Sequence, residues 1–216
     1  MDQKEVWEKK FEKKDIYGLE PDPFAIEALE WIKKIKAKKI LDLGGGEGKD
    51  SIFFAKSGYE VFCLDFSERA IASCQEKVGK NKLQKLVHPM SKDITKPLNF
   101  EDETFDVVFA HLALHYFNDK TTTRIFNEIR RILKVGGLFF VKVKSTKDPL
   151  YGKGKKLEKY MFDFGHIRHF FSREYLISKI EGFKVLSLKE IVDDTEYAKK
   201  SVSKKSVFLL LIAKKL

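Results

Sequence analysis

The stretch KKILDLGGGEGKDSIFFAKSGYEVFCLDFSE, residues 38–68, decides the fold. It begins with an apolar run, residues 39–43, of the length and composition of a buried strand. Four glycines follow within the next five residues, and a helical pattern then runs from Gly48 to Ser57 and closes at Gly58. A second strand-like run, residues 59–65, ends in an acid. A strand, a turn, a helix and a second strand form one βαβ unit, so the stretch predicts parallel strands.

The same alternation continues along the chain and predicts a doubly wound, Rossmann-like α/β fold with helices on both faces of the sheet. Expected helices cover residues 69–78, which Gly79 stops, and a segment capped by Asn118 or Asp119 and ended by Gly136 and Gly137. The last two strands follow each other without a helix between them, which favours an antiparallel pair. In all, we expect seven mostly parallel strands, at residues 39–43, 59–65, 84–88, 105–110, 138–144, 183–192 and 206–213.

The composition fits one domain over residues 1–216. The formal net charge is +10, which keeps nucleic acid open as a partner. The lysines are dispersed and often stand beside glutamates, however, so the pattern favours a solvated surface over a nucleic-acid groove. The two cysteines, Cys63 and Cys74, are expected to be reduced and buried, and no metal-ligand spacing is present. A charged N-terminus and the lack of a long apolar run predict a cytoplasmic protein with no membrane partner.

The glycine-rich turn itself suggests a ligand, because glycine lets the backbone approach a bound molecule closely. Its spacing does not match G-x-G-x-x-G, since Lys49 falls on the third glycine position. It also lacks the hydroxyl residue of a phosphate-binding loop, because Asp50 follows Lys49. What remains is Asp42-x-Gly44-x-Gly46-x-Gly48 after a strand; a tight turn without a ligand is the alternative interpretation.

This arrangement resembles the first motif of the class I S-adenosylmethionine-dependent methyltransferases, and the resemblance extends over about residues 15–216. Four further segments carry it: Asp65 in VFCLDFS, the pair Asp93-Ile94, FDVVFAHLALHYF, and LKVGGLFFV. The resemblance implies that S-adenosylmethionine is the cofactor and S-adenosylhomocysteine its product. Asp65 would then hold the ribose hydroxyls, and Asp93-Ile94 the adenine. The cofactor-binding residues that it implies are Tyr17, Asp42, Gly44, Gly46, Gly48, Asp65, Phe66, Asp93, Ile94 and His111.

The segment IYGLEPDPF, residues 16–24, resembles the lid of small-molecule methyltransferases of the tellurite-resistance and thiopurine type. In those relatives an aromatic lid residue covers the cofactor, and here we assign that role to Tyr17. Trp7 and Phe11 are the other aromatic candidates, although anchoring of the first helix explains them more simply. Residues 1–36 are thus expected to form an N-terminal helical lid, and residues 145–171, which show no clean periodicity, an insertion near the substrate cleft.

The acceptor side offers weaker candidates. A histidine near its ordinary pKa can remove a proton from an acceptor, which makes His115 and His169 candidate catalytic residues. His115 could equally cap the next helix or bind a backbone group. Arg168 could bind an anionic acceptor, or it could face water while the neighbouring phenylalanines anchor the segment. DDTEY, residues 193–197, is expected to form a solvated loop.

The sequence therefore predicts in-line methyl transfer to a small-molecule acceptor, with no metal. A methyltransferase of RNA or another macromolecule, and a non-catalytic module that binds S-adenosylmethionine, are the alternatives. AHLAL stands where amino-methylating nucleic-acid enzymes carry their proline pair, which disfavours that chemistry. Two cysteines do not suffice for arsenite methylation, and the carboxylate cluster of the metal-dependent catechol-type enzymes is absent after the fourth strand.

Overall fold

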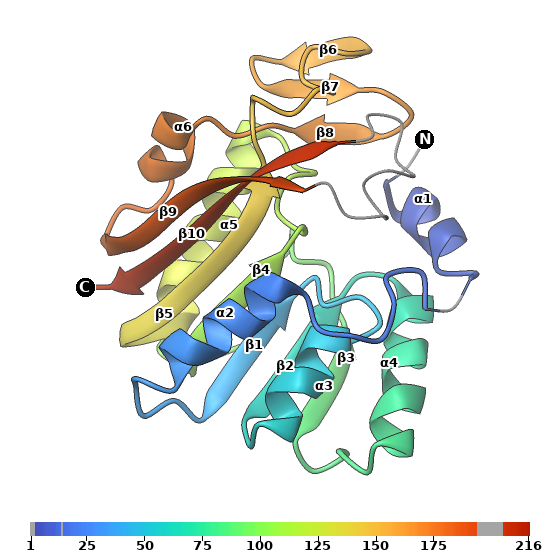
Figure 1. Ribbon diagram of the computed structural model, residues 1–216, viewed down its shortest axis with the longest axis vertical. Helices are drawn as coiled ribbons and strands as arrows, with labels where there is room; N and C mark the ends of the chain where they lie inside the picture. The colour runs from blue at the N-terminus through green and yellow to red at the C-terminus, as the bar shows by residue number, and fades with distance from the viewer. Residues whose placement is uncertain (1–2, 14, 194–204) are drawn as a thin grey trace.

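A seven-stranded sheet in the order β3-β2-β1-β4-β5-β10-β9 forms the centre of the molecule (Figure 1). The computed structural model describes residues 3–13, 15–193 and 205–216. Most of the loop expected at residues 193–197 therefore lies outside the described residues. The strands of this sheet are β1 (Lys39–Leu43), β2 (Glu60–Asp65), β3 (Val87–Ser91), β4 (Phe105–His111), β5 (Leu133–Lys144), β9 (Phe183–Asp193) and β10 (Ser206–Lys215).

The strand order reverses at β1, which pairs in parallel with β2 on one side and with β4 on the other. Ligands of doubly wound sheets bind beyond the carboxyl ends of the strands at such a reversal. At the other edge β10 runs antiparallel to both β5 and β9, so the expected C-terminal antiparallel pair is confirmed. The predicted fold class, a mostly parallel seven-stranded sheet, is confirmed as well.

Helices cover both faces of the sheet. α2, α3 and α4 contribute buried apolar residues to the core on one face, and α5 and α6 to the core on the other. In Figure 1, α2 and α3 lie in front of the strands and α5 lies behind them. The helices are α1 (Gln3–Lys10), α2 (Pro23–Ile32), α3 (Lys49–Lys56), α4 (Glu68–Lys80), α5 (Asp119–Ile132) and α6 (Arg173–Ser178). Within the described residues, none of these helices is both long and apolar enough to cross a membrane.

The predicted N-terminal lid divides into two parts. α2 begins at Pro23, as expected, and the Asp22 side chain caps it by accepting from the N–H of Phe24. Its apolar face is buried: Phe24 stacks near Phe109 of β4, and Ile32 is fully buried. α2 therefore belongs to the body of the molecule. Only α1 and the loop up to Asp22 lie over the carboxyl ends of the strands.

Two predicted helix ends are wrong. α4 continues through Gly79 to Lys80 because its amphipathic face still packs against the sheet, and Val78 is buried there. α5 ends at Ile132, and β5 starts at once at Leu133, so Gly136 and Gly137 lie inside the strand. At Gly137 a Cβ would come within 2.9 Å of the Asp106 carbonyl oxygen. Close approach to β4, rather than helix termination, therefore explains this glycine.

The segment predicted to be an aperiodic insertion contains a second, three-stranded antiparallel sheet. Its strands are β6 (Lys155–Glu158), β7 (Met161–Asp163) and β8 (Ile167–His169). Strands of three or four residues are too short to reveal a period in the sequence, which is why the interpretation missed them. This small sheet lies above the carboxyl ends of the large one, on the side where α1 lies (Figure 1).

Candidate active site

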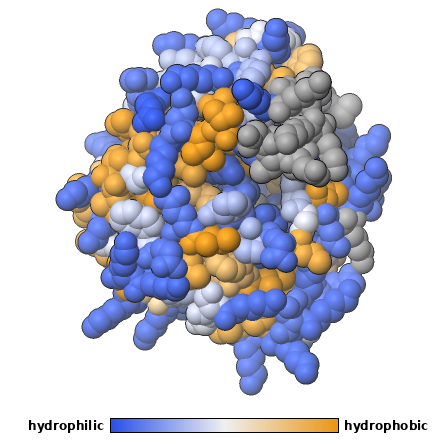
Figure 2. Space-filling model, in the orientation of Figure 1, coloured by the Kyte–Doolittle hydropathy of each residue, from blue (hydrophilic) through white to orange (hydrophobic). Residues whose placement is uncertain are grey.

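A cavity of about 1330 Å³ lies beyond the carboxyl ends of β1, β2 and β4. Its floor is the turn after β1, and its walls include α1, the loop before α2, the segment after β4, the small sheet and parts of β5, β9 and β10. Pockets of about 300–1,000 Å³ hold one drug-sized ligand, so this cavity has room for two small molecules. Hydrophilic side chains are distributed over the visible face around it rather than gathered in one patch (Figure 2).

The turn after β1 is packed tightly against the protein. Gly44 has a φ of +76°, and a Cβ there would collide with Ala113. A Cβ on Gly45 would lie 2.7 Å from both an Asp42 carboxylate oxygen and the Cys63 sulfur. Any side chain at either position would push the turn outward. The turn therefore places bare backbone along the cavity floor.

Asp65, the last residue of β2, faces this floor and is held by backbone groups. The N–H of Gly46 donates to its Oδ2 at 3.0 Å, and the N–H of Ser67 donates to its Oδ1 at 2.9 Å. Burial raises the pKa of Asp65 to about 6, although these N–H groups oppose the rise. The carboxylate keeps lone pairs that can accept from a ligand's hydroxyl groups.

Asp42 lies under the turn and is almost completely buried. The Ser51 hydroxyl donates to its Oδ2 at 2.6 Å. Burial and the nearby negative charge of Asp50 raise the pKa of Asp42 to about 7. A positively charged ligand group would offset both effects, so the site favours a cation there.

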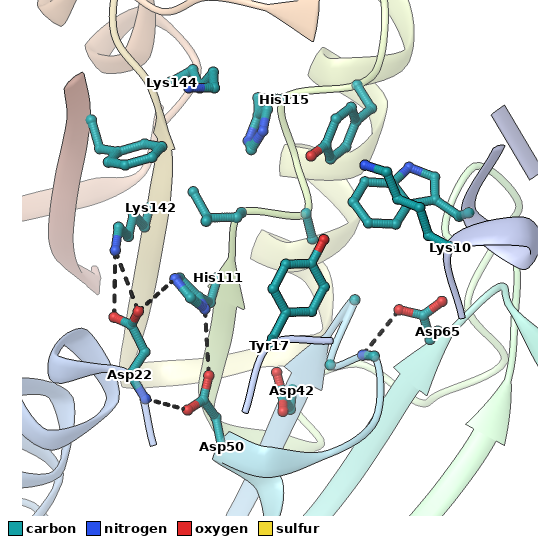
Figure 3. A pocket seen from close by; sticks show the side chains of 18 of the residues that line it. Lys10, Tyr17, Asp22, Asp42, Asp50, Asp65, His111, His115, Lys142 and Lys144 are labelled. Carbon is teal, nitrogen blue, oxygen red and sulfur yellow. Dashed lines mark hydrogen bonds and ion pairs between the residues drawn. The ribbon is translucent and has the colours of Figure 1, made fainter. Parts of the chain in front are cut away.

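The other residues proposed for the cofactor divide by position. Those that line the cavity are Tyr17, Asp42, Gly44, Gly46, Asp65, Phe66, Asp93, Ile94 and His111. Asp93 is exposed at its edge and accepts from the N–H of Thr95, while Ile94 is buried beside it. Tyr17 stands in the middle of the cavity between the acids and His115 (Figure 3). Gly48 does not line the cavity; it precedes α3, and a Cβ there would collide with the Cys74 sulfur. Both cysteines are free and buried, as expected.

A network of charges connects the loop before α2 to the sheet, and sequence reasoning missed it. His111, at the end of β4, lies between two carboxylates: its Nε2 is 3.1 Å from Asp22, and its Nδ1 is 3.4 Å from Asp50. The ammonium group of Lys142, on β5, lies 3.4 Å from Asp22 (Figure 3). Burial would lower the pKa of His111, but the two carboxylates raise it above its ordinary value.

The same charges act on Asp22. Although burial opposes them, His111 and Lys142 hold the pKa of this carboxyl well below its usual range. The only sequence signal for the network is a lysine within the apolar strand LFFVKVK, since a buried charge requires a partner.

A second connection holds the loop after α1. Glu47, in the glycine turn, accepts from the N–H of Asp15 at 3.0 Å and from the Ser73 hydroxyl at 2.8 Å. The Lys77 ammonium lies 2.7 Å from the Asp15 carboxylate and 3.4 Å from that of Glu47. Two buried acids after the strand, Glu47 and Asp50, thus hold the covering loop at its two ends.

The far end of the cavity carries histidines and cations. His115 is 2 % exposed and lines the cavity, and its Nδ1 has no hydrogen-bond partner among the described residues. Burial and the nearby Lys144 and Arg168 charges lower the pKa of His115 well below its ordinary value, so it is neutral. His169 does not line the cavity: its Nδ1 lies 2.7 Å from the Phe117 carbonyl oxygen. That bond ties β8 to the segment after β4.

Residues 40–137 match the family model of a methyltransferase domain. The chain is 32% identical over 117 residues to phosphoethanolamine N-methyltransferase 1 of Triticum aestivum, a match that covers 54% of this chain and 23% of that protein. The chain thus spans under a quarter of that relative's length.

Solved structures of other proteins superpose on nearly the whole chain. An S-adenosylmethionine-dependent methyltransferase from Methanosarcina mazei superposes with a TM-score of 0.74 at 22% identity, covering 92% of this chain and 99% of that one. TehB from Haemophilus influenzae superposes with a TM-score of 0.70 at 21% identity, covering 99% of this chain and 67% of that one. Residues 40–137 are therefore similar to a methyltransferase domain, and the chain has the fold of the class I S-adenosylmethionine-dependent methyltransferases. The resemblance stated from the glycine turn and the strand-end acids is confirmed at the level of this class.

Proposed function

We propose that this chain is a class I methyltransferase, which binds S-adenosylmethionine over its glycine turn and transfers the methyl group to a small-molecule acceptor. One observation supports the proposal above the others: bare backbone and two buried acids, Asp42 and Asp65, converge on one cavity at the strand-order reversal. The wheat relative is named for phosphoethanolamine, a small acceptor. The predicted cytoplasmic location goes with this proposal and stays a prediction.

The residues present fit the cofactor. Asp65 would accept from the ribose hydroxyls, because two backbone N–H groups already fix the orientation of its carboxylate. Asp42 would favour the cofactor's ammonium group, directly or through water, since a cation relieves the cost of ionising this buried acid. Asp93, Ile94 and Phe66 line the same side of the cavity and would contact the adenine.

S-adenosylmethionine supplies a methyl group that the positive charge on its sulfur already activates. The chain's own part is to place the acceptor in line and to exclude water, which can contribute several kcal/mol of the barrier. Tyr17 would cover the reacting region from the loop before α2. Neutral His115 could accept a proton or a hydrogen bond from the acceptor at its buried Nδ1.

Calorimetric titration with S-adenosylmethionine and S-adenosylhomocysteine tests the proposal. We expect both to bind, and Asp65→Ala to raise the dissociation constant at least about tenfold, the scale of a lost pair of charge-assisted hydrogen bonds. Asp65→Asn keeps the shape of the side chain and should also weaken binding. Glu181→Ala removes an exposed acid far from the cavity and should leave the affinity unchanged.

Failure of either compound to bind would contradict the proposal, and unchanged affinity in both Asp65 variants would contradict the ribose assignment. The alternatives predict different outcomes. Binding without transfer to any tested acceptor would favour a non-catalytic module. Steeply salt-dependent binding of RNA would favour a macromolecular acceptor.

A further inference from the structure

The two ends of the cavity differ in charge: acids predominate near the glycine turn, where His111 and Lys142 pair with Asp22, and cations predominate at the other end. In Figure 3 the labelled acids Asp22, Asp42, Asp50 and Asp65 lie at or below the level of Tyr17, whereas Lys10, Lys144 and His115 lie above it. The lower part is the proposed cofactor region. The upper part, which we call the cationic end, is formed by Lys10, Lys144, Arg168, His115 and His166, all of which line the cavity.

Two cations of this end contact neutral groups among the described residues. The Lys10 ammonium lies over the Trp7 ring at 4.0 Å, and the Arg168 guanidinium donates to the carbonyl oxygens of Phe164 and His166. In the described part of the chain, no carboxylate lies within ion-pair distance of either. Lys144 differs, because its ammonium group pairs with the buried Asp148 at 2.8 Å.

These groups are close enough to repel one another. Burial and the Arg168 charge lower the pKa of Lys10, and burial also lowers the pKa of Arg168. Burial and the charges of Arg168, Lys10 and Lys144 lower the pKa of His166 to about 3. Like charges brought together out of water raise the free energy of the molecule, and an anion placed among them lowers it.

A second, independent observation points to a ligand at the same end. The Nδ1 atom of His115 is buried and has no hydrogen-bond partner within residues 3–13, 15–193 and 205–216, although its ring lines the cavity; a buried polar atom normally has such a partner. A neutral imidazole nitrogen without a proton accepts a hydrogen bond. A ligand N–H or O–H group at this end would satisfy it.

We propose that the acceptor is a small molecule that carries an oxyanion, a carboxylate or a phosphate, held by Lys10 and Arg168, with an N–H or O–H group at Nδ1 of His115. This substrate class rests on the proposed function for its role in methyl transfer, but the anion site itself does not. Arg168 offers parallel N–H donors that match an oxyanion, and Lys10 adds a point charge. The aromatic rings of Trp7 and Tyr116, 5.3 Å apart, wall the site.

Fluorescence of Trp7 provides the test, because the Lys10 ammonium lies on its ring. The chain has two tryptophans, so Trp31→Phe leaves Trp7 as the only one. In this background we titrate the full chain with inorganic phosphate and, separately, with acetate, each compared with chloride at the same ionic strength. We expect saturable binding of at least one oxyanion, and the stronger of the two identifies the group. Lys10→Gln or Arg168→Gln should raise its dissociation constant about tenfold.

Matched controls remove the same charge elsewhere. Lys9→Gln, one position earlier on α1, and Arg124→Gln, on α5, alter exposed side chains and should leave oxyanion binding unchanged. Responses no different from chloride, or equal weakening in the Lys9 and Lys10 variants, would overturn the inference.

Calorimetry with S-adenosylhomocysteine on the same variants separates this inference from the proposed function. Normal cofactor binding with no oxyanion binding would overturn only the inference, whereas the reverse would overturn only the proposed function. If Lys10→Gln and Arg168→Gln weaken the binding of S-adenosylhomocysteine by the same factor as the binding of the oxyanion, the two cations bind the cofactor and the inference is wrong.

Discussion

At the scale of single residues, ionisation of the buried Asp42 costs free energy in the ligand-free protein. A bound cation would offset that cost. Its pKa is raised from 3.8 to about 7, so the folded chain holds this proton more tightly than the unfolded chain does. The stability that the protonated Asp42 carboxyl group contributes is therefore complete below about pH 4 and is lost as the pH rises through about 7. Ionisation above neutrality works against folding at this position.

Asp42→Asn should therefore stabilise the free protein at pH 8, by more than about 1 kcal/mol, while it weakens S-adenosylmethionine binding. Urea unfolding at pH 5 and pH 8 measures the first effect, and we expect the gain to shrink at pH 5. Asp106→Asn is the control variant for which we expect the opposite change in stability. Lys134 and two backbone N–H groups hold the pKa of Asp106 below its usual value despite burial, so that variant should lose stability at pH 8. Destabilisation by both substitutions would contradict this account.

At the scale of elements, the loop before α2 is held in place by charge. Asp22 caps α2 with one oxygen and pairs with His111 of β4 and Lys142 of β5. A helix of the body, two central strands and the covering loop therefore meet at one carboxylate. Motion of this loop over the cavity would separate charges that are largely out of water.

Asp22→Asn tests this connection, because asparagine keeps the helix cap but removes the charge. The pKa of His111, now raised by Asp22 and Asp50, should fall. Hydrogen exchange of the loop before α2 should become faster. NMR titration of the histidine rings measures the first effect. His169, whose Nδ1 contacts the Phe117 carbonyl oxygen outside the cavity, is the internal control and its pKa should not change. An unchanged His111 pKa would show that the loop is held by other contacts.

The elements also show what a sequence can and cannot predict. Asp42 and Asp65 can be proposed from the sequence because the strand pattern places them at strand ends and the family resemblance implies that acids there bind the cofactor. Lys142 and Asp22 were missed, because the pairing of residues 120 positions apart depends on how α2 packs. The sequence did not predict that β5 starts at Leu133, because a pair of glycines normally ends a helix. In this chain the two glycines lie inside the strand and allow close packing.

At the scale of the whole molecule, the cofactor would contact several parts of the chain at once. α1, the glycine turn, β2 and the segment after β4 all line one cavity. A ligand that binds only the folded state stabilises it by mass action, by about 2.7 kcal/mol at a hundredfold excess over its dissociation constant.

S-adenosylhomocysteine at that excess should raise the melting midpoint of the chain by roughly 5–10 °C. Differential scanning calorimetry measures the shift at pH 8, where Asp42 and Asp65 are ionised on binding. The shift should be smaller in Asp65→Asn and unchanged in Glu181→Ala. A midpoint that does not respond in the unmodified chain would contradict cofactor binding itself.

The packing behind the glycine turn bears on the energetics of recognition. Ala113, Cys63 and Cys74 leave no volume for a side chain at Gly44, Gly45 or Gly48, so the turn has its shape before any ligand arrives. The turn lost its conformational entropy when the chain folded, so ligand binding does not have to order it again. The cavity therefore binds its ligand with a surface that already has its final shape.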